Sequence, residues 1–85
     1  MYVNIMENLV EEALDDMKDH IEFCHCARCH DDIVALALNN LPPQYAVTSK
    51  GASMVKIKTL RYQYRTDIQK ELIKAIDIVN ENPRH

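Results

Sequence analysis

Glycine is almost absent from this chain of 85 residues, in which Gly51 is the only one. A glycine-rich loop that wraps a phosphate group is therefore excluded. The sequence also has no serine or second carboxylate in a recognisable catalytic arrangement. The best remaining route to catalysis is a zinc ion with a water in its fourth position, and zinc sites rich in thiolates are usually structural. We therefore expect a protein that is not an enzyme.

The chain also lacks an excess of positive charge. Ten lysines and arginines stand against thirteen aspartates and glutamates, which leaves a formal net charge of −3. Proteins that bind nucleic acid in general usually carry a strong basic excess. We therefore expect no general nucleic-acid binding.

Long hydrophobic runs are missing as well. No apolar stretch is long enough to cross a bilayer, so we expect no membrane insertion. Residues 1–6 contain no basic region followed by an apolar block, and the sequence predicts no signal peptide. A reducing compartment suits three free or metal-bound thiols, so we expect a cytoplasmic protein.

The length predicts a single domain that spans residues 1–85. The composition is 47% hydrophobic, which is typical of a globular chain. A domain of this size buries only about 60–65% of its unfolded surface. Such domains often need a metal ion or a partner subunit for stability.

Apolar residues recur at helical spacing, which predicts an all-α fold with three main helices and a zinc-binding loop between the first two. The first helix is expected over residues 3 to about 21, with Asn4 as its cap. The second is expected to begin at a cap formed by Asp31 or Asp32. Its residues 33–38 are apolar almost all round, so we expect it to lie within the core.

The third helix is expected to begin near Ser53 and to end before Pro83. Residues 54–57 could instead be extended. Residues 44–51 are expected to form a flexible loop, which is a common place for contacts with a ligand.

The first and third helices each carry an apolar stripe that one short helix is not expected to cover. We therefore predict a homodimer. The stripes consist of Ile5, Leu9, Ala13, Met17 and Ile21 in the first helix, and of Ile57, Leu60, Tyr64, Ile68, Leu72, Ala75, Ile76 and Val79 in the third.

All three cysteines lie close together, as Cys24, Cys26 and Cys29. Thiols at this C-x-C-x-x-C spacing can supply three ligands to a tetrahedral Zn²⁺. Their odd number argues against a purely internal set of disulfides. Two alternatives stay open: a redox couple of Cys26 with Cys29, and inert buried thiols.

The fourth zinc ligand is not evident from the spacing. His20 is a candidate, because it lies four residues before Cys24 and would share a helical face with it if the first helix ran that far. A solvated surface histidine is an equally good interpretation of His20. Asp32 or a water is the other candidate. His25 and His30 stand directly beside cysteines, where a short loop rarely lets both neighbours reach one ion.

Residues 50–65 carry five basic side chains and no acidic one. Arg61 and Arg65 are one helical turn apart, so their guanidinium groups point the same way. Paired arginines bind phosphate and stack on purines, which makes Lys50, Arg61 and Arg65 candidate ligand-binding residues. The alternative is a solvated basic face that pairs with the acidic first helix.

The chain resembles the late competence development ComFB family. The resemblance is carried by Cys24-x-Cys26-x-x-Cys29, Asp32-Ile33, Ala35-Leu36-Ala37-Leu38-Asn39, Leu41-Pro42-Pro43, Tyr45 and Asn82-Pro83-Arg84-His85.

This resemblance implies a small, helical, dimeric bacterial or cyanobacterial protein that binds zinc through Cys24, Cys26 and Cys29. It also implies a link to competence, motility or type IV pili. Some members of the family are receptors for cyclic di-GMP, so the resemblance implies a signalling module with an unknown downstream protein partner. The alternatives are a zinc-stabilised protein-interaction adaptor without nucleotide binding, and a thiol-based redox switch.

Overall fold

A computed structural model describes residues 2–47 and 52–82 of the chain. Within these residues the order of elements is strand β1 (Tyr2–Asn4), helix α1 (Ile5–Met17), helix α2 (Ala27–Asn39), strand β2 (Tyr45–Val47) and helix α3 (Ala52–Glu81). Three helices were predicted and are confirmed. None of them, over the described ranges, is both long and apolar enough to cross a membrane.

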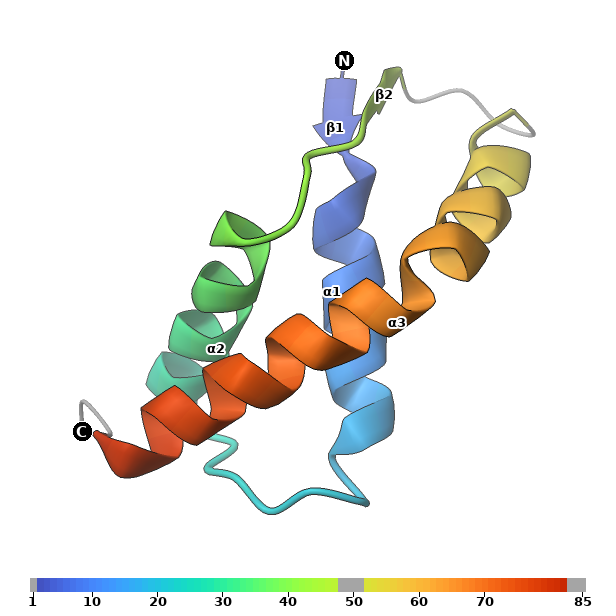
Figure 1. The fold of residues 1–85 in the computed structure, drawn as a ribbon. Helices are drawn as coiled ribbons and strands as arrows, with labels where there is room; N and C mark the ends of the chain where they lie inside the picture. The colour runs from blue at the N-terminus through green and yellow to red at the C-terminus, as the bar shows by residue number, and fades with distance from the viewer. Residues whose placement is uncertain (1, 48–51, 83–85) are drawn as a thin grey trace.

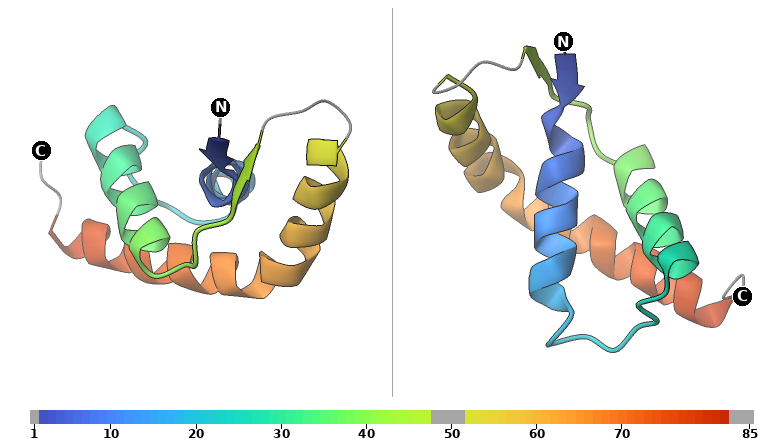
Figure 2. Two further views of the ribbon diagram at one scale, coloured as in Figure 1. Left: turned by 90° about the horizontal axis from the view of Figure 1, so that it is seen from above. Right: turned by 180° about the vertical axis from the view of Figure 1, so that it is seen from behind.

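The long helix α3 crosses both shorter helices, which lie on the same side of it (Figure 1). Seen from above, α3 is curved, and its amino-terminal part turns up beside α1 (Figure 2). The connection between α1 and α2 lies at one end of α1, and the two strands lie at the other end (Figure 1). The three helices therefore surround one shared core.

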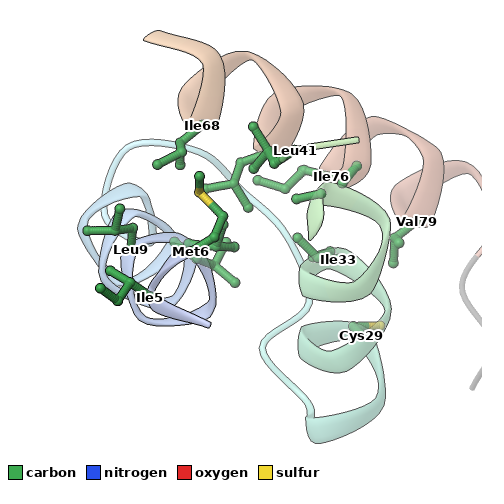
Figure 3. Close-up of a cluster of buried hydrophobic side chains, with 14 of the residues drawn as sticks. Ile5, Met6, Leu9, Cys29, Ile33, Leu41, Ile68, Ile76 and Val79 are labelled. Carbon is green, nitrogen blue, oxygen red and sulfur yellow. The ribbon is translucent and has the colours of Figure 1, made fainter. Parts of the chain in front are cut away.

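The core consists of one face from each helix (Figure 3). Most residues of the apolar stripes predicted for the first and third helices lie in this core. Met6, Val10 and Leu72 have no exposed surface at all. The buried residues are Ile5, Met6, Leu9, Val10, Leu14, Cys29, Ile33, Ala37, Leu41, Leu60, Ile68, Leu72, Ala75, Ile76 and Val79.

The all-α prediction is wrong at two short segments. Residues 2–4 and 45–47 form an antiparallel ribbon in which Tyr2 lies opposite Val47, and Asn4 opposite Tyr45. Each strand has only three residues, which is too short for the alternating pattern that identifies a strand in a sequence. The expected loop over residues 44–51 therefore contains β2, and residues 48–51 lie outside the described part of the chain.

The first two helices differ from their predicted bounds. Helix α1 ends at Met17, and residues 18–20 form a turn, so the helix does not run to residue 21. Helix α2 begins at Ala27 with Cys26 as its cap, five or six residues before the expected cap at Asp31 or Asp32. Apolar periodicity did not extend into residues 27–32, and the cysteine cap was not anticipated.

Helix α2 is buried on one face only, which corrects the prediction that it lies within the core. Cys29, Ile33 and Ala37 are buried, whereas Ala35 is exposed. Helix α3 follows its prediction closely and is helical through residues 54–57, so the extended alternative for that segment is wrong.

Most of the two apolar stripes is buried within a single chain, so the stripes by themselves do not require a homodimer. The large apolar side chains that do remain exposed include three on one face of the ribbon. Tyr2, Tyr45 and Val47 are 74%, 60% and 70% exposed. We call these three residues the ribbon face. The dimer itself stays a prediction.

Asn4 joins the start of α1 to the segment that enters β2. Its side-chain Oδ1 accepts hydrogen bonds from the backbone N–H of Met6 at 3.2 Å and from that of Gln44 at 2.8 Å. The backbone N–H of Ile5 donates to the Gln44 carbonyl at 2.7 Å. The predicted cap is therefore confirmed, and the same oxygen also holds a segment forty residues away in sequence.

We expect Asn4→Ala to lower the free energy of unfolding by about 1–2 kcal/mol, because it removes a helix cap and a tertiary hydrogen bond together. Urea denaturation measures the loss. Asn8→Ala is the matched control, since Asn8 is an exposed asparagine on the same helix. An equal effect of the two substitutions would contradict the role given to Asn4.

Candidate metal centre and the groove between α1 and α3

The three cysteines come together where the connection from α1 enters α2. Cys24 belongs to the connection, Cys26 caps α2, and Cys29 lies in its first turn. Their sulfur atoms all lie within 4.8 Å of one another. The cluster is therefore positioned to hold a metal ion, and a set of three thiolates suits a soft or borderline ion such as Zn²⁺.

Cys26 and Cys29 have different surroundings. The Sγ of Cys26 accepts a hydrogen bond from the backbone N–H of Cys29 at 3.4 Å. This bond, together with one from the Cys24 thiol, lowers the pKa of Cys26 below its usual value. Cys29 is fully buried, and burial together with the two neighbouring thiols raises its pKa to about 12. In the metal-free cluster Cys26 therefore ionises more readily than Cys29.

Cys29 belongs both to the sulfur cluster and to the hydrophobic core. Its side chain is drawn on α2 in Figure 3, one helical turn before Ile33. Cys24 and Cys26 pack against the edge of the same core. A metal ion held by these three residues would therefore link the α1–α2 connection directly to the packed interior.

The metal-capable group, among the described residues, contains neither His20 nor Asp32. The premise for His20 was a first helix that continued toward Cys24, and α1 ends at Met17 instead. The structure places His20 in the wall of a groove between α1 and α3.

His25 and His30 also lie near the cluster, and both have other contacts. The ring of His25 lies against that of Phe23, with centroids 4.6 Å apart. The Nε2 of His30 lies 2.8 Å from a carboxylate oxygen of Glu11, and its Nδ1 lies 3.1 Å from one of Asp31. The hydrogen bond with Glu11 raises the pKa of His30, and that with Asp31 adds a smaller increase.

The contact between Glu11 and His30 ties α1 to α2, and sequence reasoning missed it. The two residues are nineteen positions apart on different helices. No periodic pattern within either helix identifies such a pair.

A groove of about 710 Å³ lies between α1 and the amino-terminal part of α3. Its floor is apolar, with side chains such as Leu9 and Ile68. Its walls carry opposite charges, acidic from α1 and basic from α3. The lining residues are Leu9, Glu12, Ala13, Asp16, Met17, His20, Lys58, Arg61, Tyr62, Arg65, Ile68 and Gln69.

Both arginines predicted to bind a ligand line this groove, and Lys58 lies with them. The third predicted residue, Lys50, is outside the described residues. The Nη2 of Arg61 donates to Glu12 Oε2 at 2.5 Å. The alternative interpretation, in which the basic face pairs with the acidic first helix, is therefore confirmed for Arg61.

A family model described as late competence development protein ComFB matches residues 3–83 of the chain. The competence protein ComFB of Bacillus subtilis (strain 168) is 31% identical over 84 residues, which cover 98% of this chain and 86% of that protein. The chain belongs to the ComFB family. The predicted resemblance is confirmed, and the protein is a member of a family related to competence.

The structure is similar to one from a structural characterisation of the late competence protein ComFB from Bacillus subtilis. The TM-score is 0.82, the sequence identity is 31%, and the match covers 98% of this chain and 94% of the other. The helical fold described above is therefore that of the ComFB family.

We expect Cys26→Ser to abolish metal binding and to lower the melting temperature by about 10 °C or more, since 1 kcal/mol corresponds to about 4–8 °C in a domain of this size. Serine is itself a good helix cap, so the substitution preserves the start of α2 and isolates the contribution of the metal. Elemental analysis should find one zinc per chain in the unmodified protein and none in the variant.

The unmodified protein, after treatment with a chelator, should melt at the same temperature as the variant. A metal-free protein with serine at all three positions that kept full stability would rule out a structural role for the metal.

Proposed function

We propose that this protein is a small zinc-binding regulatory member of the ComFB family that binds cyclic di-GMP, and that it acts in competence, motility or type IV pili. It signals through a protein partner downstream and catalyses no reaction. The observation that carries the proposal is the groove between α1 and α3, where Arg61, Arg65 and Lys58 stand over an apolar floor.

Zinc has a structural role in this proposal. Cys24, Cys26 and Cys29 supply three thiolates, and a protein side chain or a water completes the tetrahedron. Binding of the ion contributes to folding, because the three ligands converge only when the connection and the first turn of α2 are formed. The ion thereby stabilises the joint between α1 and α2.

The chemistry of the ligand matches the lining of the groove. Cyclic di-GMP has two phosphates and two guanines. Arginine binds phosphate through two parallel N–H groups and also stacks on flat ring systems. The groove volume of about 710 Å³ lies within the range of about 300–1,000 Å³ that is usual for ligand pockets. In this proposal Arg65 and Arg61 hold phosphate or guanine, and Lys50 is a further candidate contact.

A homodimer is also part of the proposal, because the two-fold symmetry of cyclic di-GMP suits a site shared by two copies. The ribbon face of Tyr2, Tyr45 and Val47 is the exposed apolar surface that favours an interface.

The second candidate function is a zinc-stabilised adaptor that binds a partner protein and no nucleotide. The exposed ribbon face favours it equally, since tyrosines are common in protein interfaces. Titration with cyclic di-GMP discriminates between the two functions. The thiol-based redox switch requires two of the sulfur atoms to approach to about 2.05 Å, and a protein purified without metal and readily oxidised would favour it.

We expect Arg65→Ala to weaken binding of cyclic di-GMP at least about tenfold while leaving the fold intact, because a charge-assisted contact contributes about 1.5–3 kcal/mol. Isothermal titration of the zinc-loaded protein measures the affinity. Lys70→Ala is the matched control, since Lys70 is an exposed cation of the same helix that does not line the groove. Binding should also weaken as salt is added.

If Arg61→Ala/Arg65→Ala bound as tightly as the unmodified protein, the site would lie elsewhere. If the unmodified protein gave no heat with cyclic di-GMP, the adaptor would replace the receptor.

We expect analytical ultracentrifugation at micromolar concentration to give the mass of a dimer. Tyr45→Lys should shift the mass toward the monomer, because it places a charge in the ribbon face. Ile78→Lys is the control, since Ile78 is an exposed apolar residue of α3 that belongs neither to the ribbon face nor to the groove. A monomeric mass for the unmodified protein would contradict the dimer.

A further inference from the structure

Two consecutive glutamates of α1 contact the two neighbouring helices, one α2 and the other α3. Glu11 contacts His30 of α2 at 2.8 Å, and Glu12 contacts Arg61 of α3 at 2.5 Å. Consecutive residues of a helix point about 100° apart, so the two side chains leave α1 on different sides. Only the Glu12 contact crosses the groove proposed above as the ligand site.

The two arginines of the groove therefore differ in whether a carboxylate already pairs with them. The guanidinium group of Arg61 is engaged by Glu12. Arg65 lies one helical turn further along the same helix, and the structure gives it no ion pair with any side chain in the described ranges. An incoming anion thus meets one available arginine and one that a carboxylate already occupies.

The contact between Glu12 and Arg61 is of a kind that another anion can replace. Both side chains are about half exposed, at 54% and 51%. Exposed pairs of this kind contribute little stability, because water and salt screen their attraction. A phosphate presents the same kind of oxygen acceptor as a carboxylate and pairs with arginine in the same two-pronged way.

We propose that Glu12 is an internal competitor for the anionic ligand. In the free protein its carboxylate occupies Arg61. The phosphate of the ligand first contacts Arg65 and then takes the place of Glu12 on Arg61. Binding therefore breaks the ion pair between α1 and α3, while the contact of Glu11 with α2 is untouched.

This exchange deepens the proposed function and rests on it, because it assumes that the groove is the ligand site. It also gives the site a means of signalling. Occupancy of the groove changes how α1 is held against α3, and α1 leads directly into the connection that carries the cysteine cluster.

The test is a set of titrations with two probes, cyclic di-GMP and inorganic pyrophosphate, which has phosphates and no bases. The variants are Glu12→Gln, Asp16→Asn, Arg61→Gln and Glu12→Gln/Arg61→Gln. Glutamine keeps the shape of Glu12 and removes its charge. Asp16 lies in the same acidic wall and has no ion pair among the described side chains, so Asp16→Asn measures the general effect of removing a negative charge.

We expect Glu12→Gln to tighten binding about two- to fivefold, which corresponds to the release of an exposed ion pair. Asp16→Asn should give a smaller gain. The gain from Glu12→Gln should disappear when Arg61 is already Gln, because no guanidinium group is then left to release.

A gain in affinity that persists with Arg61→Gln, or one no larger than that of Asp16→Asn, would contradict the proposal that Glu12 competes for Arg61. Glu12 would then act only as a general negative charge near the groove. If cyclic di-GMP binds and Glu12→Gln does not raise its affinity, the receptor function is retained and the competitor role of Glu12 is ruled out. If only pyrophosphate binds, the nucleotide function falls, and the same comparison of variants decides the competitor. If neither probe binds any variant, both proposals fail.

Discussion

The burial of one apolar face of α1 and one of α2 against α3 is the contact on which the rest of the structure depends. A fully buried side chain such as Ile33 or Leu72 contributes about 1.5–3 kcal/mol relative to an exposed one. Because the buried face of α1 is set by this packing, its other sides are available for charged contacts. Glu11 turns to α2 and Glu12 to α3. The groove and its charges follow from how the helices are seated.

The cysteine cluster lies at the edge of this packing, where the connection from α1 enters α2. The connection of residues 18–26 has no regular structure over most of its length, and it must return the chain to the start of α2. Cys29 lies at that start and also within the core, so an ion bound there is coupled to the packed interior. A domain of this size often needs such a reinforcement. If zinc is bound as proposed, the ion and the core would form one stabilising unit.

The groove has the opposite character, because its walls are charged and open to solvent. Acidic residues of α1 face basic residues of α3, and one pair already meets across the gap. An arrangement of this kind is stable enough to place the side chains and weak enough to be replaced by a ligand. The two sites thus differ: the sulfur cluster is joined to the core through Cys29, and the groove has charged walls that face solvent.

The sequence by itself determined what depends on local spacing: three helices, most of their buried residues, the cap at Asn4, the three clustered cysteines and the family. The tertiary structure alone decided the pairing of residues 2–4 with 45–47, because each strand is too short to show a pattern and its partner lies about forty residues away. It also decided the start of α2 at Cys26, where a sulfur serves as the cap. Contacts such as Glu11 with His30 and Glu12 with Arg61 depend on the angle and depth at which helices pack. The periodicity of a single helix encodes neither the angle nor the depth of packing. Only the folded chain therefore shows that His20 and Arg65 line the same groove.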